Sequence, residues 1–141
     1  MATAQTLVVL QWSEEYSVGI ERFDGQHRNY FVLLEKLYRA IQQNRGRVVI
    51  GEILGELYSY SAVHMKDEED LLEYFKFAGL EKHREEHRRF RRQVREYMAD
   101  FDNGNTAIAL SLFVFMQKWL MDHMAGCDRE YTSFLRRQGV E

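Results

Sequence analysis

The chain has 141 residues, a formal net charge of −3 at pH 7 and no proline. Its length predicts one domain with a single core, and its composition, 45% hydrophobic and 29% charged, argues against a disordered chain. The absence of proline excludes collagen-like and proline-rich segments and permits long helices, while the acidic balance argues against a nucleic-acid-binding protein.

No apolar stretch of the sequence approaches the roughly 18 residues that a membrane span needs. The apolar run at residues 7–10 is too short for the core of a secretory signal, and no basic segment precedes it. We therefore expect a cytoplasmic protein that binds neither membrane nor nucleic acid. Cys127 is the single cysteine, so no disulfide can form within the chain, and we interpret it as a bystander thiol.

The predicted elements begin with an N-terminal arm at residues 1–22, which shows no helical period and which Trp12 is expected to anchor. Apolar residues then recur at three- and four-residue steps, a period typical of amphipathic helices. Asp24 has the chemistry of an N-cap for the first of these helices. The period predicts helices over about 24–43, 48–76 and 80–101, a fourth from about 106 to 125, and a short C-terminal helix over about 127–137.

Helices of about 18–28 residues that are joined by short turns predict antiparallel neighbours. We therefore expect an all-α fold, an antiparallel up-down-up-down four-helix bundle with an N-terminal arm. The whole chain, residues 1–141, is expected to form a single domain, with the bundle over about 23–125.

The apolar stripes of the predicted helices carry every histidine of the chain: His27, His64, His83, His87 and His123. One buried histidine is commonly a core residue that bonds a backbone carbonyl. Five of them would each need hydrogen-bond partners for their ring nitrogens. Each buried nitrogen without a partner would cost ~1–3 kcal/mol of stability. A shared metal site satisfies all of them at once, and in an up-down bundle the five positions converge at one end.

The spacing of these residues supports a metal site. His64 and Glu68 are four residues apart, and so are His83 and His87, so each pair projects from one face of its helix. His123 and Asp128 are five apart, which places them off a common face in a regular helix of 3.6 residues per turn. If both bind metal, the helix must distort or end between them, most easily at Gly126.

The number of donors points to two metal ions. Five imidazoles and two carboxylates exceed what one tetrahedral zinc takes, and they suit two six-coordinate ions. If Glu68, Asp128 and one oxygen atom bridge both ions, the ion with three histidines is full. The ion with two histidines then keeps an open position, where a small molecule would bind.

Other histidine-containing metal motifs fit less well. Ferritin-like sites need Glu-x-x-His pairs, but the residues three before the histidines are Asp24, Ser61, Leu80, Arg84 and Leu120. The zinc-protease pattern His-Glu-x-x-His fails because Arg84 occupies the glutamate position. The inverted pattern His-x-x-Glu-His matches residues 83–87, but it leaves three histidines unexplained.

Four stretches of the sequence together resemble the hemerythrin family, and within it the single-domain bacterial hemerythrins, over about residues 12–135. They are Asp24-Gly25-Gln26-His27, His64-Met-Lys-Asp-Glu68-Glu69, His83-x-x-x-His87-x-x-Phe90, and Trp119-Leu120-x-x-His123-x-x-x-x-Asp128. The resemblance implies that His83, His87 and His123 hold one iron and that His27 and His64 hold the other. It also implies that Glu68 and Asp128 bridge the two irons together with an oxo or hydroxo group.

The function implied by this resemblance is reversible dioxygen binding at a non-haem di-iron centre, as an oxygen carrier, store or sensor. An enzyme acting on peroxide, nitric oxide or ferrous iron is the alternative. The residues expected to line the dioxygen pocket are Trp119, Leu120, Tyr30, Met65 and Met124. Tyr30 departs from the aliphatic residue usual in the family, and its phenol is expected to bring a hydrogen-bond donor to the pocket.

The third predicted helix carries a basic stripe at Arg84, Arg88, Arg91, Arg92 and Arg95. We interpret it as a solvated face opposite the ligands, with a docking surface for an acidic protein partner as the alternative. Glu69 and Asp70 follow Glu68 and are expected to rotate away from the site as surface residues.

Overall fold

A computed structural model describes residues 8–105 and 107–141, with only the backbone described at residues 46 and 124–128. Every regular element in this part of the chain is helical. The elements are a short 3₁₀ helix Glu14–Tyr16, α1 Glu21–Gln42, α2 Gly46–Tyr74, α3 Leu80–Asp102, α4 Ala109–Trp119, the π-helical segment η2 Leu120–Cys127, and α5 Asp128–Arg137. None of the helices in the described residues is both long and apolar enough to cross a membrane.

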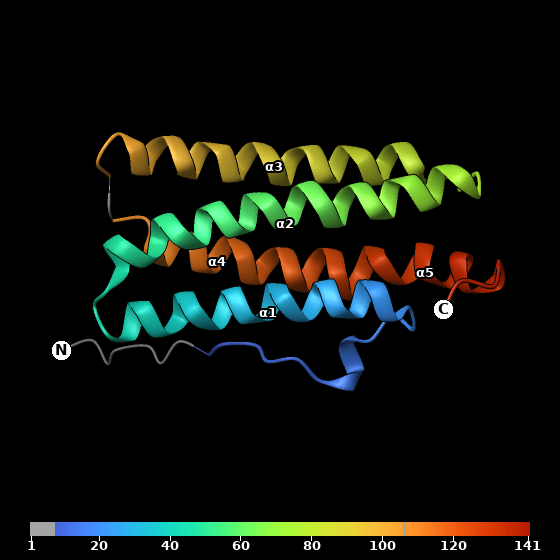
Figure 1. The fold of residues 1–141 in the computed structure, drawn as a ribbon, viewed down its shortest axis with the longest axis horizontal. Coiled ribbons are helices and arrows are strands. Elements are labelled where there is room, and N and C mark those ends of the chain that lie inside the picture. The colour runs from blue at the N-terminus through green and yellow to red at the C-terminus, as the bar shows by residue number, and fades with distance from the viewer. Residues whose placement is uncertain (1–7, 106) are drawn as a thin grey trace.

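The long helices run antiparallel to their neighbours and form a four-helix bundle (Figure 1). Helix α2 packs against α1 and α3, and α1 also packs against α4. The starts of α1 and α3, the end of α2, and α5 meet at the right-hand end of Figure 1. The predicted all-α bundle is therefore confirmed, and its topology gathers the termini of several helices at one end.

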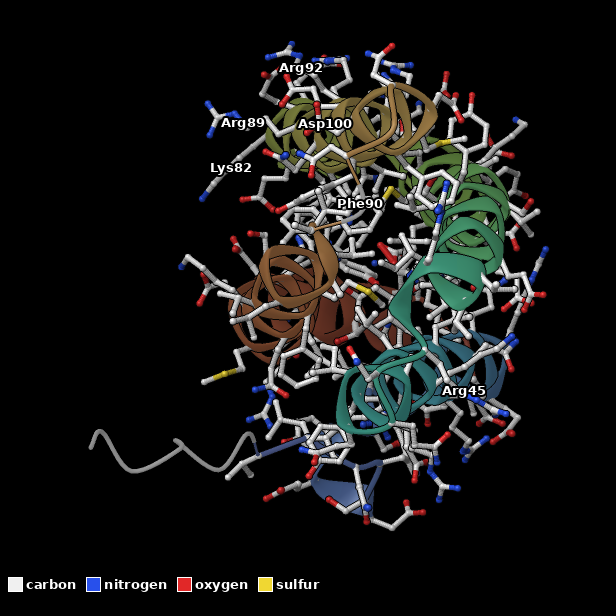
Figure 2. The ribbon with its side chains drawn as sticks, turned by 90° about the vertical axis from the view of Figure 1, so that its left-hand side faces the viewer. Arg45, Lys82, Arg89, Phe90, Arg92 and Asp100 are labelled. Carbon is white, nitrogen blue, oxygen red and sulfur yellow. The ribbon has the colours of Figure 1, made fainter. Side chains whose placement is uncertain are left out.

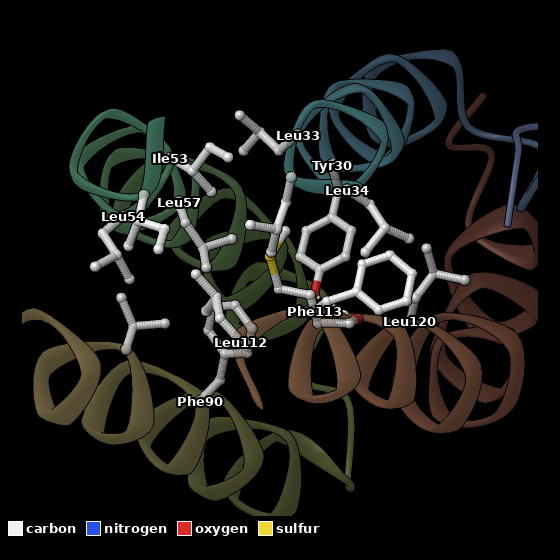
Figure 3. Packing of buried hydrophobic residues seen from close by; sticks show 14 of the residues in the cluster. Tyr30, Leu33, Leu34, Ile53, Leu54, Leu57, Phe90, Leu112, Phe113 and Leu120 are labelled. Atoms are coloured by element: carbon white, nitrogen blue, oxygen red, sulfur yellow. Dashed lines mark hydrogen bonds between the residues drawn. The ribbon is translucent and has the colours of Figure 1, made fainter. Parts of the chain in front are cut away.

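The apolar core consists of two clusters at different levels of the bundle. The larger one contains Tyr30, Leu57, Phe90 and Leu120 among others, and Figure 3 shows such residues meeting between the helices. The smaller one includes Phe23, Leu72, Tyr131 and Leu135. Viewed along the bundle, Phe90 points to the interior whereas Arg89 and Arg92 lie on the outer side of α3 (Figure 2).

The start of α1 differs from the prediction that Asp24 caps it. The N-cap is Ile20, and no side chain bonds the first turn. Asp24 lies inside the helix and is buried, where its carboxylate accepts hydrogen bonds from the Val18 amide at 2.8 Å and the Ser17 hydroxyl at 2.6 Å. Asp24 therefore stabilises the turn that leads into α1, because it satisfies donors that precede the helix.

The fourth predicted helix also differs from expectation. Regular α-helix ends at Trp119, and the chain continues as a π-helix through Cys127 before α5 begins. The predicted distortion between His123 and Asp128 is thus confirmed, although it starts before Gly126, at Leu120. Because π-helical hydrogen bonds join residues five apart, this segment brings positions with that spacing toward one side of the backbone.

The described part of the N-terminal arm is attached to the bundle. The side-chain amide of Gln117 on α4 accepts a hydrogen bond from the Leu10 amide and donates one to the Val8 carbonyl, each at 3.1 Å. The Trp12 ring meets Phe31 of α1 edge-on, with centroids 5.8 Å apart. The prediction that Trp12 anchors the arm is confirmed.

Candidate metal centre

The candidate metal centre is a layer of buried polar side chains between the two apolar clusters. On α1, His27 lies between Phe23 of the smaller cluster and Tyr30 of the larger one. On the other helices the ligand residues likewise lie between residues of the two clusters. Each helix therefore contributes ligand residues at the same level of the bundle. The buried members are His27, His64, Glu68, His83, His87 and His123.

One group of potential ligands comes from α1 and α2. The Nε2 atoms of His27 and His64 face each other at 3.2 Å, and Nε2 of His64 also contacts Oε1 of Glu68. Together these three residues offer ligating atoms that lie within 4.8 Å of one another. The four-residue spacing of His64 and Glu68 on α2 therefore does place both side chains on the inner face, as the sequence indicated.

A second group joins α2, α3 and η2 around the same carboxylate. Oε2 of Glu68 lies 2.7 Å from Nε2 of His83 and 3.6 Å from Nε2 of His87. The His123 ring completes the group, with its centroid 4.9 Å from that of His83. The ligating atoms of these four residues also lie within 4.8 Å of one another. Glu68 is thus common to both groups, one oxygen toward each.

The unmet bonding capacity of the layer fits a metal ion. Among the described residues, Nε2 of His87 has no hydrogen-bond partner although it is fully buried, a situation that costs about 1–3 kcal/mol if nothing compensates it. Imidazole nitrogens and carboxylate oxygens are the donor set that suits iron and related divalent metals. The residues present therefore fit a metal ion in each group.

Electrostatics keep the shared carboxylate charged. Burial favours the neutral form of Glu68, but its contacts with His64, His83 and His87 outweigh burial and hold the pKa of Glu68 well below its usual value. For His87, burial lowers the pKa, but the nearby carboxylates of Glu68 and Glu69 outweigh burial and raise it. A charged Glu68 is the form that binds metal cations.

The sequence did not identify three residues that bond the ligand histidines through Nδ1, the outer ring nitrogen that faces away from the candidate metal position. Nδ1 of His87 bonds Oε2 of Glu69, and Nδ1 of His123 bonds Oε2 of Glu86, each at 2.9 Å. Nδ1 of His64 bonds Oε1 of Gln26. Gln26 stood in the quoted motif beside His27, whereas nothing in the local helical period marks Glu86.

Two predictions about charged residues are wrong. Glu69 was expected at the surface, but its side chain is only 17% exposed and holds His87. Arg84 and Arg91 were placed opposite the ligands, yet their guanidinium groups reach back to Glu69, at 3.4 and 3.9 Å. Asp70 is exposed and pairs with Lys66, as expected of a surface residue. The basic stripe is therefore divided, with part of it supporting the site.

Among the residues predicted to line the pocket, Trp119 has a clear relation to the site. Its indole stacks on the His123 ring, with centroids 4.2 Å apart and an angle of 15° between the planes. Leu120 and Met65 are buried in the larger apolar cluster. The side chains of Met124 and of the predicted bridging ligand Asp128 lie outside the described residues.

Tyr30 does not offer the donor that the sequence led us to expect. Its ring is fully buried in the larger cluster, and its hydroxyl donates to the backbone carbonyl of Met116 at 2.7 Å. Figure 3 shows the phenol pointing from α1 toward α4. Because this proton already has a backbone acceptor, the expectation of a phenol that donates into the pocket is wrong.

Comparison with known sequences agrees with this arrangement. Residues 18–135 match the family described as the hemerythrin HHE cation binding domain. A bacteriohemerythrin of Stenotrophomonas maltophilia is 30% identical over 126 residues, covering 89% of this chain and 81% of the relative. A bacteriohemerythrin of Clostridium acetobutylicum is 29% identical over 125 residues, covering 85% of this chain and 96% of the relative.

Comparison with solved structures supports the fold. The crystal structure of a hemerythrin point mutant superposes with a TM-score of 0.81 at 23% sequence identity, covering 90% of this chain and 97% of the other. The predicted resemblance is therefore confirmed by sequence and fold alike. With a family match over most of its length and a buried histidine and glutamate cluster suited to cations, the chain belongs to the hemerythrin family.

Proposed function

We propose that this protein is a non-haem di-iron protein that binds dioxygen reversibly. The observation that carries the proposal is the position of Glu68, whose two carboxylate oxygens face two separate groups of buried histidines. A carboxylate shared in this way is suited to bridge two cations. The likeness to proteins named bacteriohemerythrin supports iron as the metal.

The two groups would hold unequal numbers of ligands. His83, His87 and His123 would bind one iron and His27 and His64 the other, with Glu68 between them. By the family resemblance, Asp128 would be the second carboxylate ligand shared by the two ions. The ion with fewer histidines would have room for dioxygen as a further ligand, and two ferrous ions would supply the chemistry of its reversible binding.

The chain's own contribution is a dry, fixed environment. The apolar clusters above and below the ligand layer exclude water from it. The Trp119 indole covers one side of the His123 ring, and Tyr131 covers His83, with ring centroids 4.7 Å apart. Restricting water and protons in this way favours release of dioxygen unchanged over its further reduction.

The experiment that tests the proposal is a visible absorption spectrum of the anaerobic ferrous protein, recorded in sequence before air, after air and after argon. A charge-transfer band that appears in air and fades under argon is the expected result. Irreversible oxidation without this band would contradict it. Steady-state consumption of peroxide, nitric oxide or ferrous iron, in place of reversible binding, would instead assign the protein to the enzyme class.

A further inference from the structure

The outer nitrogens of three ligand histidines are held by acceptors of different charge. Glu69 and Glu86 are carboxylates, and they hold His87 and His123 in the three-histidine group. Gln26 is a neutral amide, and it holds His64 in the two-histidine group. These acceptors are therefore charged in the group predicted to bind one metal ion and neutral in the group predicted to bind the other.

The orientation of the Gln26 amide is determined by its own surroundings. Its Nε2 donates to Oδ2 of Asp67 at 2.7 Å, and Asp67 pairs with Arg22 at 2.8 Å. Because a carboxylate only accepts, the amide nitrogen must face Asp67, and the amide oxygen therefore faces His64. His64 thus carries its proton on Nδ1 and directs the lone pair of Nε2 into the site.

The two carboxylates are sheltered from solvent to different degrees. The side chains of Glu69 and Glu86 are 17% and 25% exposed, so water screens their charges only in part. Besides His87, the carboxylate of Glu69 faces the guanidinium groups of Arg84 and Arg91 at 3.4 and 3.9 Å.

An acceptor on Nδ1 changes what Nε2 does. A carboxylate draws the Nδ1 proton toward itself, which makes the opposite nitrogen a stronger donor to a bound metal. A stronger donor stabilises the more highly charged oxidation state. A neutral amide orients the imidazole ring equally well, but it strengthens the Nε2 donor less than a carboxylate does.

We propose that Glu69 and Glu86 are positioning residues that make the three-histidine iron the more easily oxidised of the pair, and that Gln26 leaves the two-histidine iron harder to oxidise. The inference rests on the proposed function in taking two irons as the metal ions, and it does not depend on dioxygen binding. It attributes the redox difference between the two iron sites to three residues that are not themselves ligands.

The test compares isosteric variants of the iron-loaded protein in a mediated redox titration. Glu86→Gln and Glu69→Gln keep an oxygen acceptor for the histidine but remove the charge. A tenfold shift of each oxidation equilibrium toward the ferrous state is expected, equal to about 59 mV for one electron. Gln26→Glu should shift the equilibrium of the other iron in the opposite direction.

The matched control is Glu85→Gln. Glu85 neighbours Glu86 in sequence, is 44% exposed, and pairs with Arg88 and Arg89 instead of a histidine. Potentials of Glu86→Gln and Glu69→Gln equal to those of Glu85→Gln would overturn the proposal. A Gln26→Glu variant with unchanged potentials would overturn the part that concerns Gln26.

A second measurement separates charge from mere orientation and does not depend on dioxygen. Zinc binding to the metal-free protein should weaken about 10- to 100-fold in Glu86→Ala, which removes the acceptor altogether, and less in Glu86→Gln. Equal zinc affinity in the parent and Glu86→Ala would contradict a positioning role. If dioxygen binding is not reversible but these shifts appear, the proposed function fails while the positioning role stands.

Discussion

At the scale of single residues, Tyr30 illustrates how a polar group can belong to the core. Its ring packs against Tyr60 and Phe90, with centroids 5.4 and 6.4 Å away. Its hydroxyl bonds the Met116 carbonyl, which also accepts the amide of Leu120, where α4 gives way to the π-helix. Tyr30 therefore connects α1 to the place where the fourth helix changes its geometry.

The change Tyr30→Phe removes this hydrogen bond without opening a large cavity. Because the Met116 carbonyl keeps its bond from Leu120, we expect the free energy of unfolding to fall by only about 1 kcal/mol. Urea denaturation of parent and variant measures this. Iron content, and the lifetime of any oxygenated form, should remain as in the parent, and faster or slower decay would show that the phenol acts on the site.

The pH dependence of stability provides a separate test of Tyr30. Burial raises the pKa of its phenol well above the usual 10.0. Above about pH 10 the unfolded chain releases this proton while the folded chain keeps it, so the free energy of unfolding falls as pH rises. The advantage of the parent over Tyr30→Phe should be constant below about pH 9 and shrink above about pH 10. A difference that does not change with pH would contradict the burial argument.

Glu68 and His123 should differ in how much metal their loss removes. Glu68 belongs to both ligand groups and His123 to one, so Glu68→Ala should lose most of both ions, whereas His123→Ala should mainly weaken the three-histidine site. Metal analysis after dialysis, with circular dichroism to verify folding, distinguishes the two. Equal losses would show that the carboxylate does not serve both groups.

At the scale of elements, the ends of helices determine where ligands lie. Helix α1 starts after a turn in which Gly19 has φ of 77°, a conformation that favours glycine. Asp24 closes this turn by accepting the Val18 amide and the Ser17 hydroxyl. The turn therefore sets the start of α1 and with it the level of His27, one helical turn further along.

Replacing Asp24 by alanine should leave the buried Val18 amide without its acceptor. We expect a loss of about 1–3 kcal/mol in the free energy of unfolding, measured by urea denaturation of the metal-free protein. Glu21→Ala is the control, because Glu21 also lies in the first turn of α1 but is exposed, and among the described residues it pairs only with the partly exposed Arg28. Equal effects of the two changes would mean that the turn does not depend on Asp24.

At the scale of the whole molecule, the ligand layer interrupts the apolar core. Five histidines and a charged glutamate lie between two clusters of apolar side chains. Such a layer adds little apolar contact between the helices around it. A metal ion held by ligands from several helices would join them at this level.

Metal removal should therefore lower the thermal stability of the entire bundle. A metal that binds only the folded chain adds about 4 kcal/mol when its free concentration is a thousandfold above Kd, which corresponds to roughly 14 °C in Tm for a chain of this size. Calorimetry of the metal-free and reloaded protein measures the difference. Magnesium, which prefers oxygen ligands, is the control and should not raise Tm, and an unchanged Tm on iron loading would count against the site.

Much of the fold and of the inner ligand set could be predicted from the sequence, because both depend on local periodicity. Apolar residues at helical spacing place His64 and Glu68 on one inner face. The five-residue spacing of His123 and Asp128 predicts a helix distortion if both bind metal, and η2 is such a distortion. Short-range sterics and backbone hydrogen bonds decide such features within one element.

The tertiary structure alone decided which residues support the ligands from other helices. Glu86 meets His123 of η2, and Glu69 of α2 meets His87 of α3, across contacts that no period within one helix encodes. Tyr30 finds its acceptor in Met116, 86 positions along the chain. The physical reason is that the rotation and crossing of packed helices and the rotamers of their side chains select these partners, and they are set only once the bundle has formed.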